Sequence, residues 1–236
     1  MVDAVYTAGD TFQDGCWEPA AIQLPSNEIQ LFFANESPYR TSNEQEISLL
    51  RSLDGGLTWS APECVGFRQG HRDGMPVPVL LANNAGIAVA IEDNGLNGPF
   101  KPAILFSTLQ DSWRSGMRTG DSSQRWSALH TPLPASTYAG APYLRQWNAT
   151  TTVLSFQQSA SGNMKQSRLA VCLGTATAQS FSGCSYPFPE TAQPQLWGSL
   201  CIHDARTVTI LATLTMNGQF GVWSIEGHLP EPASNQ

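Results

Sequence analysis

The segment RSLDGGLTWS, residues 51–60, overlaps the alternating run EISLLR (46–51) and has the spacing Ser-x-Asp-x-Gly-x-x-Trp. Its two adjacent glycines permit a tight turn between antiparallel strands, because glycine adopts left-handed backbone angles at little steric cost. Within such a turn the Asp54 carboxylate accepts backbone N–H groups and the Trp59 ring packs against the sheet. The segment therefore predicts a structural turn between the third and fourth strands of a β unit, and it argues against Asp54 as a catalytic acid.

Short alternating or β-branched runs, separated by Gly, Pro, Asn and Ser, recur along the whole chain, and helical periodicity is almost absent. This pattern is typical of an all-β protein. The runs form four groups, whose first runs begin near residues 20, 76, 141 and 196. A unit of three or four strands at this period predicts the blades of a single β-propeller domain, 1–236, because the alternative, a stacked β-sandwich, requires no repeat. The expected blades are 16–67, 75–116, 140–187 and 195–229.

The second group ends in STLQDSWRSG (107–116), which keeps Ser107 and Trp113 but lacks the glycine turn. We interpret this segment as a degenerate copy of the 51–60 turn. Its last residues, SWRSG (112–116), are then the final short run of the second blade.

The composition excludes several classes of protein. With 12 Lys and Arg among 236 residues and a net charge of −7, no basic cluster is available to bind nucleic acid or an anionic membrane. No apolar run approaches the roughly 18 residues of a transmembrane helix. The four histidines are scattered and the five cysteines lack CxxC spacing, so the sequence predicts no metal site and no cofactor.

Secretion is favoured by two features, although the start MVDAVYTAGD (1–10) is not a signal peptide. Cys172 and Cys184 lie in consecutive strand-like segments, where they either pair in an oxidising compartment or remain buried thiols. Asn35 and Asn148 each begin a glycosylation sequon. We therefore expect an extracellular protein, with the disulfide as one of two alternatives.

The blade geometry places acidic side chains together. The innermost strand of a blade runs along the propeller axis and the second strand returns beside it. Residues just before an inner strand and just after a second strand thus share one face. Glu18 precedes the first inner strand, and Arg72 and Asp73 precede the second, whose partner strand closes with Glu92 and Asp93. We expect these groups to converge at one mouth of the propeller.

Several motifs together resemble a known group of enzymes. The first is the Asp-box of the sialidase superfamily of propellers, formed by Ser52, Asp54, Gly56 and Trp59. Further segments are similar to the exo-α-1,5-L-arabinanase family of sialidase-like glycoside hydrolases, namely GCWEPAAIQLPSNEIQLFFANE (15–36), GHRDGMPVPVLL (70–81) and AIED (90–93). The resemblance extends from about residue 14 to residue 229.

The resemblance implies a six-bladed propeller, whereas the sequence contains only about four blades. We therefore expect an N-terminally truncated chain, with two blades and a secretion signal before residue 1. The run DAVYT (3–7) is expected to be the outer strand of a lost blade. The alternative is that it supplies a fourth strand to the last blade and closes a ring.

Cleavage of a glycosidic bond requires one carboxylic acid to protonate the leaving oxygen and one carboxylate to attack or to activate water. Glu18 and Glu92 are the candidates, and they match the two catalytic glutamates of the family, which the resemblance implies to be retaining. We assign Glu18 as acid/base, because the neighbouring Trp17 can exclude water and raise its pKa, and Glu92 as nucleophile. The two roles can be exchanged. The structural alternatives are a solvated strand-start carboxylate and a turn residue.

The remaining predicted site residues surround this pair. Trp17 can stack on a sugar ring, and Asp93 is assigned to substrate binding. Asp73 can tune the protonation of the pair or bind sugar hydroxyls; its structural alternative is a turn residue before Gly74. Arg72 can orient Asp73, contact substrate or form a structural salt bridge. Tyr186 resembles the tyrosine nucleophile of sialidases, and the resemblance implies a hydrogen-bonding role beside the anomeric carbon; its alternative is packing in a Pro-rich linker. Three tryptophans within strand runs are predicted to be core: Trp147, Trp197 and Trp223.

The sequence thus predicts an exo-arabinanase-like hydrolase that releases arabinose units from the ends of α-1,5-arabinan, a polysaccharide substrate. The first alternative is a non-catalytic Asp-box propeller, either a carbohydrate-binding module or an inactive hydrolase fragment with an unpaired apolar face that favours association. The second alternative, a sialidase, requires an arginine triad for the sialic carboxylate. The candidate arginines do not occupy equivalent points of successive blades: Arg40, Arg72, Arg145 and Arg206.

Overall fold

A computed structural model describes residues 4–9, 11 and 14–229 as a nearly all-β chain of four antiparallel sheets. Three sheets have four strands in chain order and the last has three. Blade 1 comprises β1 (Cys16–Gln23), β2 (Ile29–Asn35), β3 (Glu46–Ser52) and β4 (Glu63–Gly66). Blade 2 comprises β5 (Asp73–Leu80), β6 (Ile87–Asp93), β7 (Lys101–Ser107) and β8 (Arg125–Ser127). Blade 3 comprises β9 (Tyr138–Asn148), β10 (Thr151–Ser159), β11 (Arg168–Thr175) and β12 (Ser182–Ser185). Blade 4 comprises β13 (Leu196–Ile202), β14 (Thr207–Met216) and β15 (Gln219–His228).

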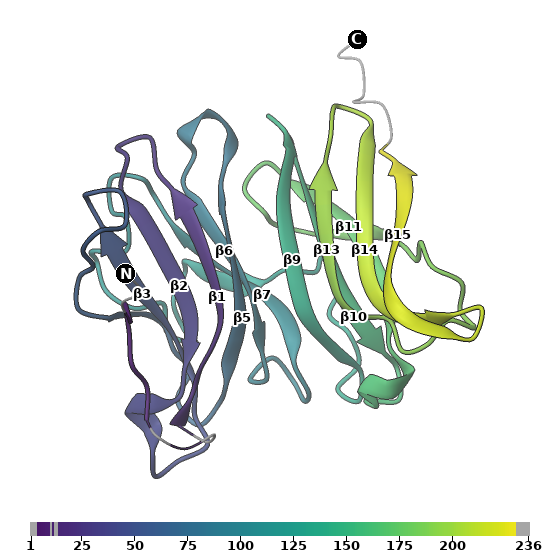
Figure 1. The fold of residues 1–236 in the computed structure, drawn as a ribbon, viewed down its shortest axis with the longest axis horizontal. Helices are drawn as coiled ribbons and strands as arrows, with labels where there is room; N and C mark the ends of the chain where they lie inside the picture. The colour runs from purple at the N-terminus through teal and green to yellow at the C-terminus, as the bar shows by residue number, and fades with distance from the viewer. Residues whose placement is uncertain (1–3, 10, 12–13, 230–236) are drawn as a thin grey trace.

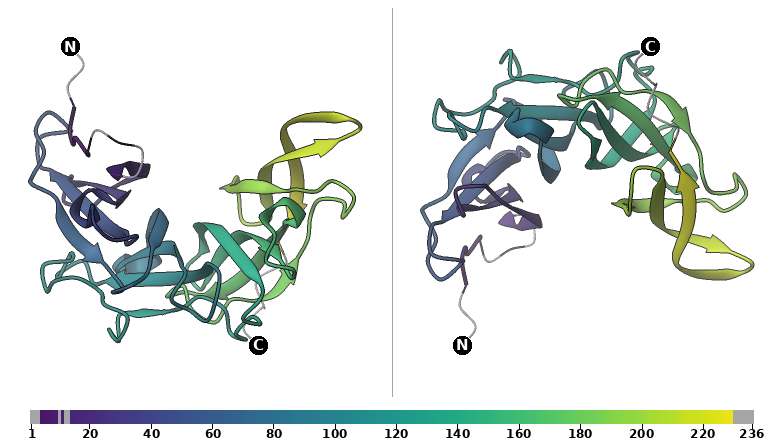
Figure 2. Two further views of the ribbon diagram at one scale, coloured as in Figure 1. Left: turned by 90° about the horizontal axis from the view of Figure 1, so that it is seen from below. Right: turned by 90° about the horizontal axis from the view of Figure 1, so that it is seen from above.

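The four first strands, β1, β5, β9 and β13, lie side by side in chain order (Figure 1). They line the concave side of an arc whose two ends do not meet (Figure 2). This is the arrangement of blades around a propeller axis, with four blades and no closed ring.

Three hydrophobic cores hold the arc together, one between each pair of successive blades. Strand β6 shows how: its Val89 and Ile91 pack toward blade 1, and its Ala88 and Ala90 pack toward blade 3. A strand covered on both faces is an almost continuous apolar run, here IAVAI. Strand β14 in the last blade instead alternates, because only one of its faces, with Val208, Ile210, Ala212 and Leu214, is covered by blade 3.

The 51–60 turn connects β3 to β4 and is organised by Asp54. Its Oδ1 accepts the N–H groups of Leu57 at 3.0 Å and Thr58 at 2.9 Å, and Ser52 Oγ donates to it at 2.9 Å. Gly55 and Gly56 have φ angles of 75° and 92°. The hydrogen bonds lower the pKa of Asp54 to about 2, so its carboxylate stays ionised and has a structural role in the turn.

The second copy of this turn is more complete than its sequence indicates. Asp111 takes the part that Asp54 has in the first turn. Its carboxylate accepts the Ser115 N–H at 2.7 Å and the Ser107 hydroxyl at 3.0 Å. Ser112 and Trp113 adopt left-handed φ angles of 46° and 69°. Residues 112–116 are therefore part of a turn, and the predicted short run there is wrong; the fourth strand is β8.

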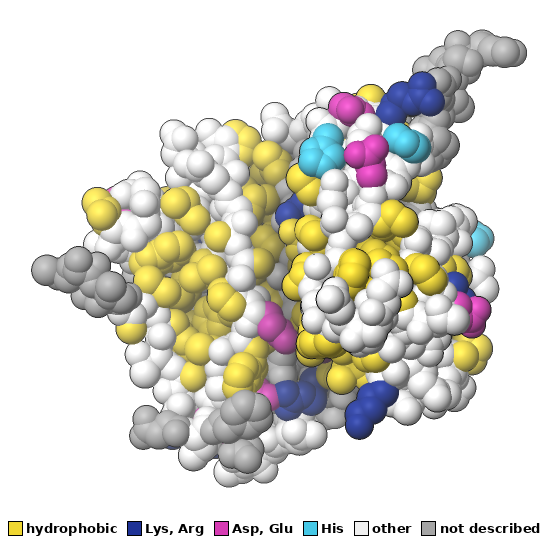
Figure 3. All heavy atoms as spheres, turned by 45° about the vertical axis from the view of Figure 1, so that its right-hand side comes forward, with side chains coloured by type: hydrophobic (Ala, Val, Ile, Leu, Met, Phe, Trp, Pro, Cys, Tyr) yellow, Lys and Arg dark blue, Asp and Glu magenta, His cyan; other side chains and the backbone are white. Residues whose placement is uncertain are grey.

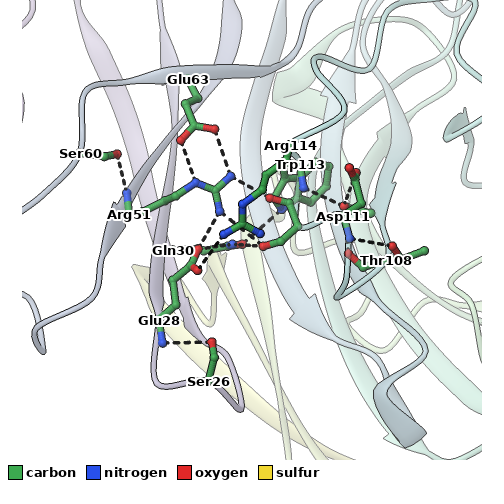
Figure 4. Close-up of polar contacts among 12 residues, drawn as sticks. Ser26, Glu28, Gln30, Arg51, Ser60, Glu63, Thr108, Asp111, Trp113 and Arg114 are labelled. Carbon is green, nitrogen blue, oxygen red and sulfur yellow. Dashed lines mark hydrogen bonds and ion pairs between the residues drawn. The ribbon is translucent and has the colours of Figure 1, made fainter.

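Trp113 of blade 2 packs against blade 1 (Figure 4). Its side chain is buried, with 2% exposure. Its indole N–H donates to Gln30 of β2 at 3.2 Å, and its ring meets Phe32 edge-on. Beside it, Arg51 pairs with Glu28 and Glu63, each at 2.7 Å. Blades 1 and 2 are thus joined by buried aromatic packing and by hydrogen bonds at its edge.

The two end blades expose several large apolar side chains. Leu57 in the first turn is 85% exposed, and Phe220 and Val222 in β15 are 70% and 74% exposed. Residues 4–9 form no strand; Tyr6 lies on Phe33 of β2 with ring centroids 4.8 Å apart. The described part of the run 3–7 thus supplies neither an outer strand nor a closing strand.

Cys172 of β11 and Cys184 of β12 form a disulfide within blade 3. Of the two alternatives for these cysteines, the structure has the bonded one. No helix in the described part of the chain is long and apolar enough to span a bilayer.

Candidate functional site

The same irregularity recurs in all four inner strands. Four residues have left-handed backbone angles, with φ of 56°, 50°, 49° and 49°: Glu18, Met75, Ala141 and Trp197. The first three are each followed by proline and the last by glycine. The strand pairing skips two residues at each point, which is a β-bulge. A bulge turns the N–H of its residue out of the ladder, so that N–H needs another acceptor.

In three of the four bulges a side chain of the preceding blade accepts this N–H. Glu18 Oε2 accepts the Met75 N–H at 2.8 Å, and Glu92 Oε2 accepts the Ala141 N–H at 2.9 Å. The amide oxygen of Gln157 accepts the Trp197 N–H at 2.9 Å. These side chains therefore tie blade 1 to 2, blade 2 to 3 and blade 3 to 4.

Glu92 and Gln157 hold the same position in their blades. Each lies at the end of the second strand, opposite the glycine that precedes the bulge, Gly74 or Gly140. Because a glutamine suffices in blade 3, the bond between blades does not require the charge of Glu92.

Glu18 and Glu92 line one cavity of about 830 Å³, together with Trp17, Glu36 and Arg72. The structure thus brings together four of the residues that the sequence singles out. Figure 3 shows acidic and basic side chains in the hollow between the two halves of the arc. The catalytic role of the two glutamates stays a prediction.

The surroundings of the two glutamates shift their pKa values by different amounts. Burial raises the pKa of Glu92 to about 7; the negative charge of Glu18 adds to the rise, while the Ala141 N–H and Arg72 oppose it. Glu18 is more exposed, and partial burial raises its pKa above the ordinary value against the Met75 N–H and Arg72. Near neutral pH, Glu92 is therefore the group that exchanges a proton.

Arg72 and Trp17 are held in place by Glu36. The Trp17 indole N–H donates to Glu36 Oε2 at 3.0 Å, and the Arg72 guanidinium pairs with Glu36 Oε1 and hydrogen-bonds Gln45. Arg72 also donates to Asn43 Oδ1 at 3.1 Å. It does not orient Asp73, which was one of its predicted roles; it is a fixed positive charge in the cavity.

Asp73 and Asp93 are not in this cavity, and their predicted contact with substrate is wrong. They are register partners with 0% exposure. Arg125 bridges them, with both Asp73 oxygens at 2.6 and 2.7 Å, and Arg68 donates to Asp93 at 3.0 and 3.1 Å. Successive residues of a strand point to opposite faces, so Asp93 points to the other face of blade 2 from Glu92, where Arg68 contacts it. Both aspartates are structural.

Tyr186 is also not among the residues that line the glutamate cavity. It lines a separate cavity of about 380 Å³ with Gln158 and Glu190, and the Arg168 guanidinium lies 4.5 Å from its ring centroid. Trp197, predicted to be core, is 55% exposed. The bulge explains this, because its left-handed backbone turns the side chain out of the sheet.

Tyr138, the first residue of β9, is not among the predicted site residues. Its hydroxyl accepts the Gln157 amide N–H at 2.8 Å. The hydroxyl and Glu92 Oε2 lie 2.4 and 2.5 Å from the point that a Cβ on Gly140 would occupy, so only glycine leaves room for both. Tyr138 holds the register position in blade 3 that Arg72 holds in blade 2, and aligning the x-Pro pairs 75–76 and 141–142 would have found it.

The cavity combines the carboxyl groups of Glu18 and Glu92, the second partly protonated near neutral pH, with the guanidinium and indole that Glu36 holds. Such a set can transfer a proton and place a carboxylate near a polar substrate. In the described part of the chain no group of three or more His, Cys, Asp or Glu residues is placed to hold a metal ion.

No protein-family profile and no curated protein matches the sequence. Solved structures do match. An α-L-arabinofuranosidase of Fusarium graminearum in complex with an iminosugar inhibitor gives a TM-score of 0.63 at 15% identity, over 90% of this chain and 58% of that one. An α-L-arabinanase of Penicillium chrysogenum complexed with arabinobiose gives 0.61 at 12% identity, over 92% and 64%. A Hadza microbial sialidase gives 0.65 at 11% identity, over 95% and 48%.

A polysaccharide lyase that acts on ulvan is also similar, with a TM-score of 0.57 at 12% identity over 89% of this chain and 52% of that one. At such identities these similarities establish the fold alone, that of a β-propeller. The chain spans about half to two thirds of the length of these proteins.

Proposed function

We propose that this protein is a glycoside hydrolase that releases terminal arabinose units, as arabinobiose, from α-1,5-linked arabinan, with Glu18 and Glu92 as its catalytic pair. The observation that carries the proposal is that these two carboxyl groups, placed by equivalent irregularities of successive blades, line one cavity and have unequal pKa values. The similar arabinofuranosidase and arabinanase support the sugar class.

The geometry favours an exchange of the roles assigned from the sequence. A general acid should hold its proton near the working pH, and Glu92, with a pKa of about 7, does so. Glu92 would protonate the glycosidic oxygen while the Glu18 carboxylate attacks the anomeric carbon and the leaving alcohol departs. The Glu92 carboxylate would then take a proton from water, which displaces Glu18 from the sugar. The Arg72 guanidinium, which lines the same cavity, would favour the ionised form of Glu18.

We also propose that the protein works outside the cell. The disulfide between Cys172 and Cys184 supports this, because such bonds persist in oxidising compartments.

The second candidate function is a carbohydrate-binding propeller without turnover. Two observations favour it: Glu92 makes a bond that Gln157 makes without a charge, and the chain spans only about half to two thirds of the similar enzymes. Its cavity would then bind sugar through Trp17 and Arg72.

The deciding experiment measures the release of arabinobiose from linear arabino-oligosaccharides by the purified chain, by Glu18→Gln and by Glu92→Gln. Turnover that either substitution abolishes supports the hydrolase. Binding of the oligosaccharides by a folded, monomeric chain without turnover supports the carbohydrate-binding alternative. Turnover that survives both substitutions would refute the assignment of the pair.

A further inference from the structure

Trp197 occupies a backbone position that its residue type does not favour. Its φ of 49° lies in the left-handed region, which bulky side chains rarely adopt, and its N–H is fixed by Gln157. The equivalent bulge in blade 3 holds Ala141 and that in blade 2 holds Met75. The fold therefore does not need an indole here, and yet a large aromatic surface is held 55% exposed. Such strained, exposed positions point to function.

The four bulges together line a groove of about 250 Å³ on the concave side of the arc. Its lining is mostly apolar and includes Pro19, Pro76, Pro142 and Tyr143, with Trp197 from blade 4. Glu18 belongs to both this groove and the 830 Å³ cavity. The groove therefore begins at a proposed catalytic carboxylate and leads across the inner strands to an aromatic ring.

We propose that this groove binds a further sugar unit of an oligosaccharide held at Glu18 and Glu92, with the apolar face of the sugar ring stacked on the indole of Trp197. A sugar ring presents C–H groups on its face and hydroxyl groups at its edge. A shallow groove with proline and tryptophan walls covers the face and leaves the edge in water, which suits such a ligand.

The position of Trp197 distinguishes a saccharide from a second protein copy. Its ring shares the groove with the bulges of blades 1, 2 and 3, next to the polar cavity. The exposed apolar residues that a neighbouring sheet would cover, Phe220 and Val222, lie instead on β15, the outer edge strand of blade 4. The proposal rests on the proposed function, because it assigns the direction in which the substrate chain extends from the cleavage point.

The test uses Glu92→Gln, which we expect to bind without turnover, with and without Trp197→Ala. The alanine reproduces the residue of the equivalent bulge in blade 3, so the fold should be retained, and Trp197→Met reproduces blade 2. Titration calorimetry follows binding of linear arabino-oligosaccharides of increasing length, beside xylo- and galacto-oligosaccharides. We expect Trp197→Ala to weaken binding of the longest ligand by roughly tenfold or more, as loss of one well-packed aromatic contact does, and to change binding of the disaccharide much less. Leu57→Ala, which removes an exposed side chain far from the groove in sequence, is the matched control.

Equal affinity of both proteins for the longest ligand would overturn the groove assignment even if turnover supports the hydrolase. Binding of another sugar that depends on Trp197 would support the groove while the arabinan substrate fails. If no oligosaccharide binds, both proposals fall. A dimer of the parent protein that Trp197→Ala converts to a monomer in sedimentation analysis would identify a second copy as the occupant and overturn the inference.

Discussion

In blade 2 the carboxylate of Glu92 accepts the N–H of the next bulge, and in blade 3 the amide oxygen of Gln157 accepts its counterpart, both at 2.9 Å. The two side chains have the same register position and almost the same shape. Only one of them can ionise, and burial raises its pKa to about 7. A neutral amide would make the bond without any cost of burying a charge. The hydrogen bond therefore has a structural explanation in both blades. The ionisable carboxyl group of Glu92 needs a functional one.

Glu92→Gln separates these two properties most strongly. It gives blade 2 the side chain of blade 3, so the bond to the Ala141 N–H should persist and the melting temperature should not fall. Turnover should fall by about 10²- to 10⁴-fold, the usual contribution of a general acid–base group. Arabinobiose release and thermal unfolding of the same preparations measure both. Parallel losses of activity and stability would show that the charge is structural after all.

Blades 2 and 3 also differ beside this position. Where blade 2 has Asp73 and Asp93 with Arg125, blade 3 has Ala139 and Gln158 in the same register. Replacing Arg125 with Met should leave the buried Asp73 carboxylate without its guanidinium partner, beside Asp93, which keeps Arg68. We expect this to destabilise the protein by about 3–5 kcal/mol.

Urea unfolding measures the effect of Arg125→Met. Arg114→Met is the control, because Arg114 has a 61% exposed side chain and makes only a 3.7 Å pair with Glu28. A loss no larger than that of the control would contradict the structural role given to Asp73 and Asp93.

Gly140 lies beside the hydrogen bond between Glu92 and the Ala141 N–H and tests how closely Glu92 is packed. A methyl group there would occupy the space of the Tyr138 hydroxyl and of Glu92 Oε2. Gly140 lies outside the left-handed backbone region, so Gly140→Ala tests packing alone. We expect a loss of about 1–3 kcal/mol in unfolding free energy, together with reduced turnover.

The matched control for Gly140→Ala is Gly221→Ala on β15. The nearest atom to a Cβ there is Trp223 Nε1 at 3.8 Å, so this substitution should change little. Equal effects of the two alanines would show that the crowding around Glu92 is unimportant.

The blades and the glutamate pair could be predicted from sequence because both follow from strand order. Apolar runs mark the strands, and residues near the start of a first strand and at the end of a second strand meet at one mouth. The side of the sheet to which each side chain points is harder to predict than the order of the strands. Asp73 is adjacent to Gly74 and Asp93 to Glu92, but adjacent residues point to opposite sides, so both aspartates are buried away from the cavity.

The exposed Trp197 and the role of Tyr138 depend on the bulge, which shifts the alternation of the strand. Apolar patterns carry no direct signal of a bulge. The prolines that follow Glu18, Met75 and Ala141 are such a signal, since each marks the preceding residue as the one that turns out of the sheet. Aligning the blades on these prolines places Arg72 against Tyr138 and Glu92 against Gln157.

The charge in blade 2 also makes stability depend on pH. The folded pKa of Glu92, about 7, lies above its ordinary value of 4.5, so the folded state holds a proton that the unfolded state releases. This contribution to stability is complete below pH 4.5 and is lost as the pH rises through 7. Glu92→Gln has no such proton, and Glu18 and Arg72 stay unchanged in both proteins. Urea unfolding at about pH 4.5 and pH 8 should therefore find the two proteins closest at the lower pH and the glutamine variant more stable at the higher one. A parent protein that gains stability relative to the variant as pH rises would mean that Arg72, and not burial, governs Glu92.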